Sequence, residues 1–118
     1  MNHVIRISET GGPEVMQWET QGVVSPGPSE ILLRQTAVGL NYIDVYFRSG
    51  VYPAPQLPFT PGLEGAGVVE AVGEEVTDLA PGDHVGYAAQ PLGAYAESRL
   101  IPADRVVRLP DGIEDRVP

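Results

Sequence analysis

Three tyrosines near the middle of the chain are the residues whose chemistry best suits ligand binding. Tyr42 and Tyr46 are spaced one helical turn apart, and Tyr52 follows in a proline-rich segment. A tyrosine offers a flat apolar face and a hydroxyl, which suits a planar ligand held by stacking and one hydrogen bond. The same pattern is equally compatible with Tyr46 and Phe47 packing into a hydrophobic core, so both interpretations stand on the residues alone.

Metal and nucleotide sites have weak support in the sequence. His3 and His84 are the only imidazoles, and the chain has no cysteine. Zinc takes three or four converging N, S or O ligands, so we expect no metal site. Segment Gly62–Gly67 reads GLEGAG, a GxxGxG spacing that reverses the GxGxxG of a dinucleotide loop and opens a predicted strand instead of a helix. We therefore interpret its glycines as structural.

The charge balance excludes further classes of function. Over 118 residues the net charge is −9, and all seven basic residues are arginine. Without lysine, neither Schiff-base chemistry nor a Walker-type phosphate loop is available. So acidic a chain would also repel a nucleic-acid backbone. The start lacks the apolar stretch of a signal peptide, and no apolar run approaches the ~18 residues of a membrane span. We expect a soluble, cytoplasmic domain that binds neither nucleic acid nor membrane.

The elements that must position the tyrosines are predicted to be mainly strands. Apolar and polar residues alternate in several short segments separated by turns rich in glycine and proline. The predicted strands are 2–8, 15–19, 30–38, 62–73, 84–88, 94–101 and 106–109. This pattern is typical of an all-β domain and favours a barrel, with one short helix after the third strand.

The helix is predicted over 41–49. Its apolar stripe has the i, i+3, i+4 spacing of one helix face and consists of Ile43, Tyr46 and Phe47. Asn41 is placed to cap its start, and Gly50 to end it in the left-handed conformation. Asp44 and Arg48 are four residues apart, acid first, which predicts an ion pair on the helix surface. The prolines of 51–61 predict a rigid, extended loop directly after the helix.

Six segments carry a pattern that extends over almost the whole chain. They are Gly39–Gly50, Tyr52–Pro53, Pro58–Val69, Pro81–Val85, Gly93–Glu97 and Leu109–Ile113. Together they resemble the N-terminal, GroES-like domain of the medium-chain dehydrogenase/reductase superfamily. Within it they look most like the zinc-free NADPH:quinone oxidoreductases of the zeta-crystallin type. The resemblance implies a mainly β fold, a GroES-like partly open barrel with a short inserted helix at about 41–49.

The resemblance also implies a set of site residues. Zinc-dependent relatives have a cysteine where this chain has Asn41 and a histidine where it has Leu63, so no catalytic metal is expected. Asn41 is expected beside the nicotinamide, with cofactor contacts from Asn41, Tyr42 and Tyr46 and substrate contacts from Tyr46 and Tyr52. Glu64 occupies the carboxylate position that follows the metal-ligating histidine of those relatives, and we expect it to hold backbone donors or an arginine.

The implied reaction is hydride transfer from NADPH to a quinone or a similar small electrophile. Without a metal, hydrogen-bond donors must stabilise the developing oxyanion. Asn41 and Tyr46 are the candidate catalytic donors, because a cap uses the asparagine oxygen and leaves its NH₂ group free. The alternative is that Asn41 only caps the helix and Tyr46 only packs.

The resemblance implies a domain organisation as well. Residues 1–118 correspond to the catalytic, substrate-side domain, and relatives continue past the equivalent of Ile113 into a nucleotide-binding Rossmann domain that this chain lacks. We therefore expect a fragment that is inactive alone, homodimeric when intact, and prone to self-association through exposed apolar surface. The alternative is a stand-alone GroES-like binding or assembly module without catalysis.

Overall fold

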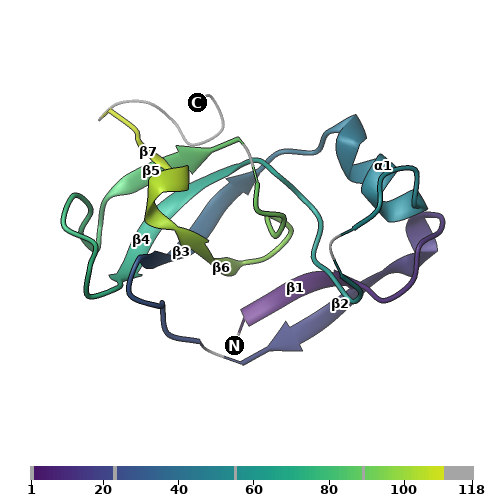
Figure 1. Cartoon of the computed structure of the whole chain (residues 1–118), viewed down its shortest axis with the longest axis horizontal. Coiled ribbons are helices and arrows are strands. Elements are labelled where there is room, and N and C mark those ends of the chain that lie inside the picture. Colours follow the sequence, from purple (N-terminus) through teal and green to yellow (C-terminus); the bar gives the residue numbers. More distant parts are fainter. Residues whose placement is uncertain (1, 23, 55, 89, 111–118) are drawn as a thin grey trace.

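Strands dominate the described part of the chain, which comprises residues 2–22, 24–54, 56–88 and 90–110 of this computed structural model (Figure 1). The elements are β1 (Asn2–Ile7), β2 (Met16–Gln21), β3 (Glu30–Val38), α1 (Tyr42–Ser49), β4 (Gly65–Val72), β5 (His84–Tyr87), β6 (Ser98–Pro102) and β7 (Val107–Arg108). β1 pairs with β2, and a five-stranded antiparallel sheet has the order β6-β3-β4-β5-β7. Within these residues β6 and β7 are sheet edges, so the barrel is partly open. The predicted mainly β fold with an inserted helix is confirmed.

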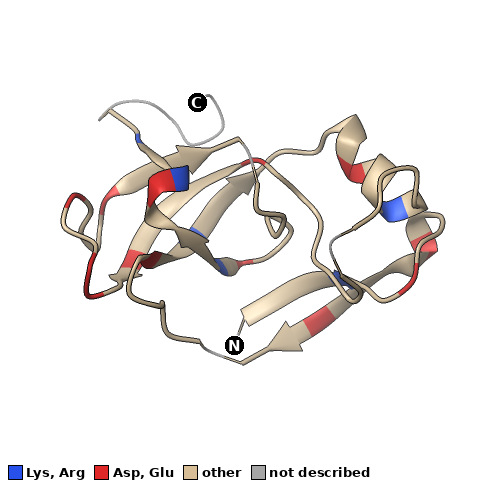
Figure 2. Ribbon diagram, viewed as in Figure 1, with Lys and Arg blue, Asp and Glu red and all other residues tan. Residues whose placement is uncertain are grey.

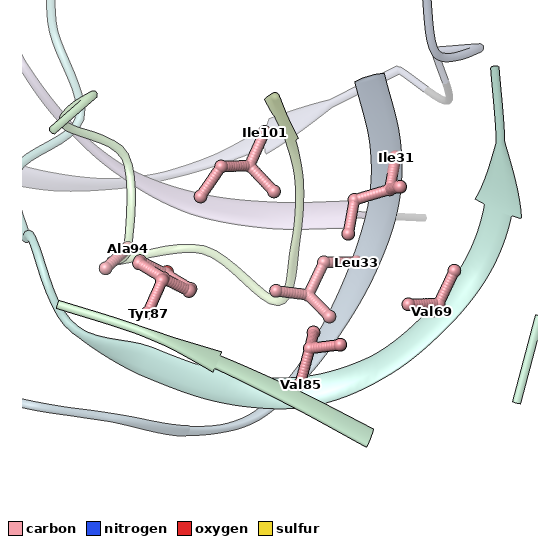
Figure 3. Close-up of a cluster of buried hydrophobic side chains, with 7 residues drawn as sticks. All are labelled: Ile31, Leu33, Val69, Val85, Tyr87, Ala94 and Ile101. Carbon is pink, nitrogen blue, oxygen red and sulfur yellow. The ribbon is translucent and has the colours of Figure 1, made fainter. Parts of the chain in front are cut away.

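The main hydrophobic core lies on one face of the five-stranded sheet. β3 is central to it, because Leu33 pairs with Val69 of β4 on one side and with Arg99 of β6 on the other. Alternation along β3 buries Leu33 completely and leaves Arg34 exposed. Figure 3 shows the cluster, which consists of Ile31, Leu33, Val69, Val85, Tyr87, Ala94 and Ile101. Removing this apolar surface from water is the main stabilising contribution of the sheet.

A second, smaller core holds the helix against the β1–β2 hairpin. Ile7 of β1, Phe47 of α1 and Phe59 are buried together. Ile7 and Phe59 also exchange two backbone hydrogen bonds, of 2.8 and 2.9 Å. Ile43 is partly buried in the same cluster, as the helical stripe predicts. Figure 1 shows the result: α1 lies near the turn between β1 and β2, away from β7.

Two strands begin three or four residues later than the alternation predicts. The strand predicted over 94–101 begins at Ser98, and that predicted over 62–73 begins at Gly65. Segment 94–97 forms no continuous ladder and bonds instead to three places: the loop around Gly62, β1 and β3. The Ile5 N–H of β1 donates to the Tyr95 carbonyl at 2.8 Å. Ala94 N–H donates to the Gly62 carbonyl at 3.2 Å, and the Gln35 amide donates to the Ala94 carbonyl at 2.8 Å. These crossing bonds place segment 94–97 between the sheet and the helix.

Acidic side chains are spread over strands, loops and helix (Figure 2). Arg6 contacts Glu19 at 3.5 Å and Arg108 contacts Asp83 at 3.0 Å, so these basic groups lie beside carboxylates. Several apolar side chains are exposed, with Leu40 at 81% and Val107 at 68%. None of the helices in the described residues is long and apolar enough to cross a membrane.

Candidate functional site

The start of helix α1 is fixed by a buried carboxylate. Asn41 is the N-cap residue, with φ −130° and ψ 158°, and Gly50 ends the helix at φ +88°. Asn41 and Asp44 form a capping box, in which Asp44 Oδ2 accepts a hydrogen bond from the Asn41 backbone N–H at 3.0 Å. The Asp44 N–H donates to the Asn41 carbonyl at 3.0 Å. The predicted caps at both ends of the helix are therefore confirmed.

The predicted surface ion pair between Asp44 and Arg48 is wrong. Asp44 is only 4% exposed, and its Oδ2 also accepts the Tyr95 hydroxyl at 2.7 Å. Arg48 instead donates from Nε to the Gly11 carbonyl at 3.1 Å. The reason is that segment 94–97 covers the helix face that the sequence alone leaves open to solvent. Burial, together with the neighbouring Asp44 carboxylate, raises the pKa of Tyr95, so its hydroxyl stays protonated and donates to Asp44.

Replacing Tyr95 with phenylalanine is expected to lower the free energy of unfolding by about 1–2 kcal/mol, because the buried Asp44 carboxylate then loses a hydrogen-bond donor. The effect is kept to this size because Tyr95 itself is only partly buried. The second oxygen of Asp44 already lacks a hydrogen-bond partner among the described residues. Because the pKa of Tyr95 is higher in the folded than in the unfolded chain, its hydroxyl stabilises the fold at pH values below the unfolded pKa of about 10. This contribution is lost as the pH rises above that value.

Urea denaturation at pH 7 and pH 11 measures the effect. The difference between parent and Tyr95→Phe should shrink at the higher pH. Tyr42→Phe is the matched control, because Tyr42 is 83% exposed and its loss should change little. Equal stability of Tyr95→Phe and the parent at pH 7 would contradict the role assigned to the Asp44–Tyr95 contact.

Asn41 also meets a second carboxylate. Its side-chain Nδ2 donates to Glu64 Oε1 at 3.0 Å, and both residues are exposed. The expectation that the Glu64 carboxylate holds backbone donors or an arginine is therefore wrong. Gly39 explains the difference, since a β-carbon at that position would overlap the Glu64 carboxylate. The asparagine NH₂ group is consequently only half free, with one N–H engaged.

The structure brings Tyr46 and Tyr52 together. Their ring centroids are 5.4 Å apart in an edge-to-face arrangement, and the Tyr52 N–H donates to the Tyr46 carbonyl at 3.1 Å. Tyr46 is 40% exposed whereas Phe47 is buried, so the core interpretation holds for Phe47 and fails for Tyr46. No other described residue bonds the Tyr46 hydroxyl, which is left as a donor. Tyr42 projects into solvent and takes no part in this ring pair.

The glycines of 62–67 leave space that protein atoms fill. A β-carbon on Gly62 would lie 2.6 Å from the Tyr95 ring, and one on Gly67 would overlap the Arg34 backbone carbonyl. Gly62 has φ +104°, a conformation that favours glycine. The segment therefore serves close packing between chain segments, and the structural interpretation of the GxxGxG spacing is confirmed.

One cavity of about 390 Å³ adjoins the Asn41–Glu64 pair, a feature that no local sequence pattern indicates. Its lining consists of Ala37, Val38, Gly39, Glu64, Gly65, Ala66, Gly86, Tyr87, Ala88, Val107 and Leu109. Glu64 is the single charged residue among these described residues, so its carboxylate sets the polarity of one end of an otherwise apolar space. Tyr46 and Tyr52 are not among the residues that line this cavity.

Leu63, at a position linked to zinc in relatives, and His3 have ordinary structural roles. Leu63 is partly buried against the Ile7–Phe47–Phe59 cluster. His3 Nδ1 lies 2.9 Å from a Glu97 carboxylate oxygen, and its ring stacks on Trp18 at 5.0 Å. The part of the chain that the structure describes contains no group of three or more His, Cys, Asp or Glu side chains placed to hold a metal ion.

The model of the alcohol dehydrogenase GroES-like domain family matches residues 27–111. The chain belongs to this family. A quinone oxidoreductase from Pseudomonas aeruginosa is 52% identical to this GroES-like domain, with 93% of the chain and 34% of the relative covered. A 2-haloacrylate reductase from a Burkholderia species is 42% identical, with 92% of the chain and 33% of the relative covered.

Solved structures agree with the family assignment. The crystal structure of Escherichia coli quinone oxidoreductase complexed with NADPH has a TM-score of 0.93 and 42% identity to the GroES-like domain. That comparison covers 96% of this chain and 35% of the other. The chain thus spans about a third of the length of the relatives that it matches, and the resemblance carried by its motifs is confirmed.

Proposed function

We propose that this GroES-like domain forms the substrate side of an NADPH-dependent, zinc-free quinone oxidoreductase. The observation that carries the proposal is the half-exposed Tyr46–Tyr52 ring pair with a free hydroxyl on Tyr46. A planar quinone suits such a surface, because a ring can pack against it while a carbonyl oxygen accepts a hydrogen bond. Similarity to the Pseudomonas aeruginosa quinone oxidoreductase over nearly the whole chain supports the substrate class.

Two donors are proposed as catalytic groups. NADPH, when bound, supplies the hydride. As the quinone carbonyl gains negative charge, the Tyr46 hydroxyl and the remaining Asn41 N–H donate to its oxygen, and preorganised donors of this kind lower the barrier. Tyr46 and Tyr52 also hold the quinone ring. An amide and an aliphatic side chain at 41 and 63 cannot replace a thiolate and an imidazole, which supports a zinc-free site.

The donors present fit one end of the cofactor only. Asn41, Tyr42 and Tyr46 offer an amide and hydroxyls, which suit the nicotinamide ring and its carboxamide. The phosphates require cations or a glycine cradle. Arg48 of the same helix is instead bound to the Gly11 carbonyl, and protein atoms fill the space beside the glycines of 62–67. We propose that a Rossmann domain, in the length that the relatives have beyond this domain, binds the phosphates and forms the homodimer.

Electron-poor alkenes are a second candidate substrate class. The Burkholderia relative is named a 2-haloacrylate reductase, and it is 42% identical to this domain. Hydride addition to such an alkene also develops negative charge next to a carbonyl or carboxylate, so the same donors would serve. Assaying a quinone and an unsaturated carboxylate in parallel distinguishes the two classes.

Replacing Tyr46 with phenylalanine in a protein that includes the nucleotide-binding domain is expected to lower kcat/KM for benzoquinone about tenfold, the value of one hydrogen bond made in the transition state. Steady-state oxidation of NADPH at 340 nm measures this. Trp18→Phe is the control, since Trp18 is exposed on β2 and belongs to no part of the proposed site. An unchanged kcat/KM would remove the hydroxyl from the mechanism.

A further inference from the structure

Asn41 is held at both ends by carboxylates. Its backbone N–H donates to Asp44 Oδ2 at 3.0 Å, and its side-chain Nδ2 donates to Glu64 Oε1 at 3.0 Å. Asp44 explains the helix start, but a cap needs no contact to Glu64, which lies 23 residues further along the chain. The second contact therefore has a purpose beyond starting α1.

The backbone is built to bring Glu64 to this place. The Gly39 N–H donates to the Glu64 carbonyl at 3.0 Å, which ties the end of β3 to the segment before β4. The carboxylate then occupies the space that a side chain at position 39 would fill. Since any other residue at 39 would displace the carboxylate, the Gly39–Glu64–Asn41 arrangement is a unit.

The chemistry of the contact fixes the amide in one orientation. An ionised carboxylate only accepts hydrogen bonds, so the NH₂ end of the asparagine must face Glu64 and its oxygen must face away. One N–H is left, and Asn41 is exposed. Without the amide, a bare carboxylate would stand beside the apolar cavity of about 390 Å³ and would repel a developing oxyanion.

We propose that Glu64 is a positioning residue that fixes the orientation of the Asn41 amide and thereby presents its second N–H to a ligand carbonyl oxygen. The identity of the ligand rests on the proposed function. The orientation itself does not, and it can be measured on the 118-residue chain alone.

The side-chain amide protons of Asn41 test the orientation directly by ¹⁵N NMR, with their signals assigned by their loss in Asn41→Ser. In the parent, one proton should exchange with water about threefold to tenfold more slowly than those of a free amide, as a hydrogen bond predicts. Its chemical shift should also follow the protonation of Glu64 on acidification. Glu64→Ala should abolish both signatures.

Glu64→Gln separates positioning from folding. A glutamine oxygen still accepts the hydrogen bond, so slow exchange should persist, while the acid-induced change in shift should vanish. Glu70→Gln, on the exposed side of β4, is the matched control and should behave as the parent. Asn41 protons that exchange freely in the parent, or that are unaffected by both Glu64 variants, would overturn the proposal.

The consequence for the reaction is measured in the protein that includes the nucleotide-binding domain. Glu64→Ala should lower kcat/KM for benzoquinone about tenfold, and Glu64→Gln should recover most of it at neutral pH. If the parent shows the NMR signature and Glu64→Ala loses it, but kcat/KM of Glu64→Ala is unchanged, then the second N–H of Asn41 does not act on the ligand and that part of the proposal is overturned. If the parent reduces no quinone, the proposed function fails, and the NMR result still decides the orientation.

Discussion

Replacing Gly67 with alanine is expected to lower the free energy of unfolding by about 3 kcal/mol or more, since overpacking against a backbone cannot be relieved by rotating a side chain. Gly67 pairs with Gln35 across β3 and β4, next to an irregularity in the register of β3. A β-carbon at 67 would overlap the Arg34 carbonyl oxygen and lie 2.8 Å from the Gln35 Cα. β3 and β4 would have to separate, and both contribute to the main core.

Two other glycines provide matched controls. Gly22 has nothing within 4 Å of its would-be β-carbon, and at Gly86 of β5 the nearest atom is 3.5 Å away on the Leu109 side chain. Alanine at either position should change the free energy of unfolding by less than about 1 kcal/mol. Urea denaturation of the three variants compares them directly. A Gly67→Ala variant as stable as Gly22→Ala would show that β3 and β4 approach less closely than described.

The helix could be predicted to the residue because its signals are local. Asn41 and Gly50 lie at its two ends, and the capping box and the left-handed glycine involve only neighbours in sequence. Burial of Ile43 and Phe47 follows from the same periodicity. The strands were predicted for the same reason wherever one face is buried, as in β3.

The environment of Asp44 could not be predicted from the helix alone. The four-residue spacing of Asp44 and Arg48 predicts an ion pair only for a helix whose surface is open to solvent. The Tyr95 hydroxyl that donates to Asp44 comes from a residue 51 positions away in the chain. Segment 94–97 alternates like a strand, yet its backbone bonds are divided among β1, β3 and the loop around Gly62, and nothing local encodes those partners. Alternation specifies which face is buried and leaves open which partner covers it.

The candidate site shows the same division. Sequence reasoning singled out Asn41, Tyr46 and Tyr52, and the structure joins Tyr46 to Tyr52. The sequence did not predict the pairing of Asn41 with Glu64, because that contact depends on the absence of a side chain at Gly39. A glycine directly after an apolar strand was the available signal, and it acquires meaning only once the neighbouring segment is placed.

Residues 1–118 alone are expected to show no oxidation of NADPH by benzoquinone above the rate without protein. The domain is about a third of its relatives' length. Its glycine segment is packed against protein, and the helix arginine is bound to a backbone carbonyl. A ring contact and one or two neutral hydrogen bonds support at most millimolar affinity, about 4 kcal/mol of binding free energy.

Absorbance at 340 nm measures turnover, and quenching of the exposed Trp18 and tyrosines measures binding of NADPH and quinone separately. A protein that includes the nucleotide-binding domain is the positive control. If residues 1–118 form a substrate-side domain, they should bind quinone without turnover. The longer protein should show turnover. Turnover by residues 1–118 would mean that the barrel, or an assembly of it, builds a complete cofactor site. Two results together would favour an assembly module: oligomers of one defined size in analytical ultracentrifugation, and no turnover by either protein. Assembly needs only exposed apolar side chains such as Leu40 and Val107.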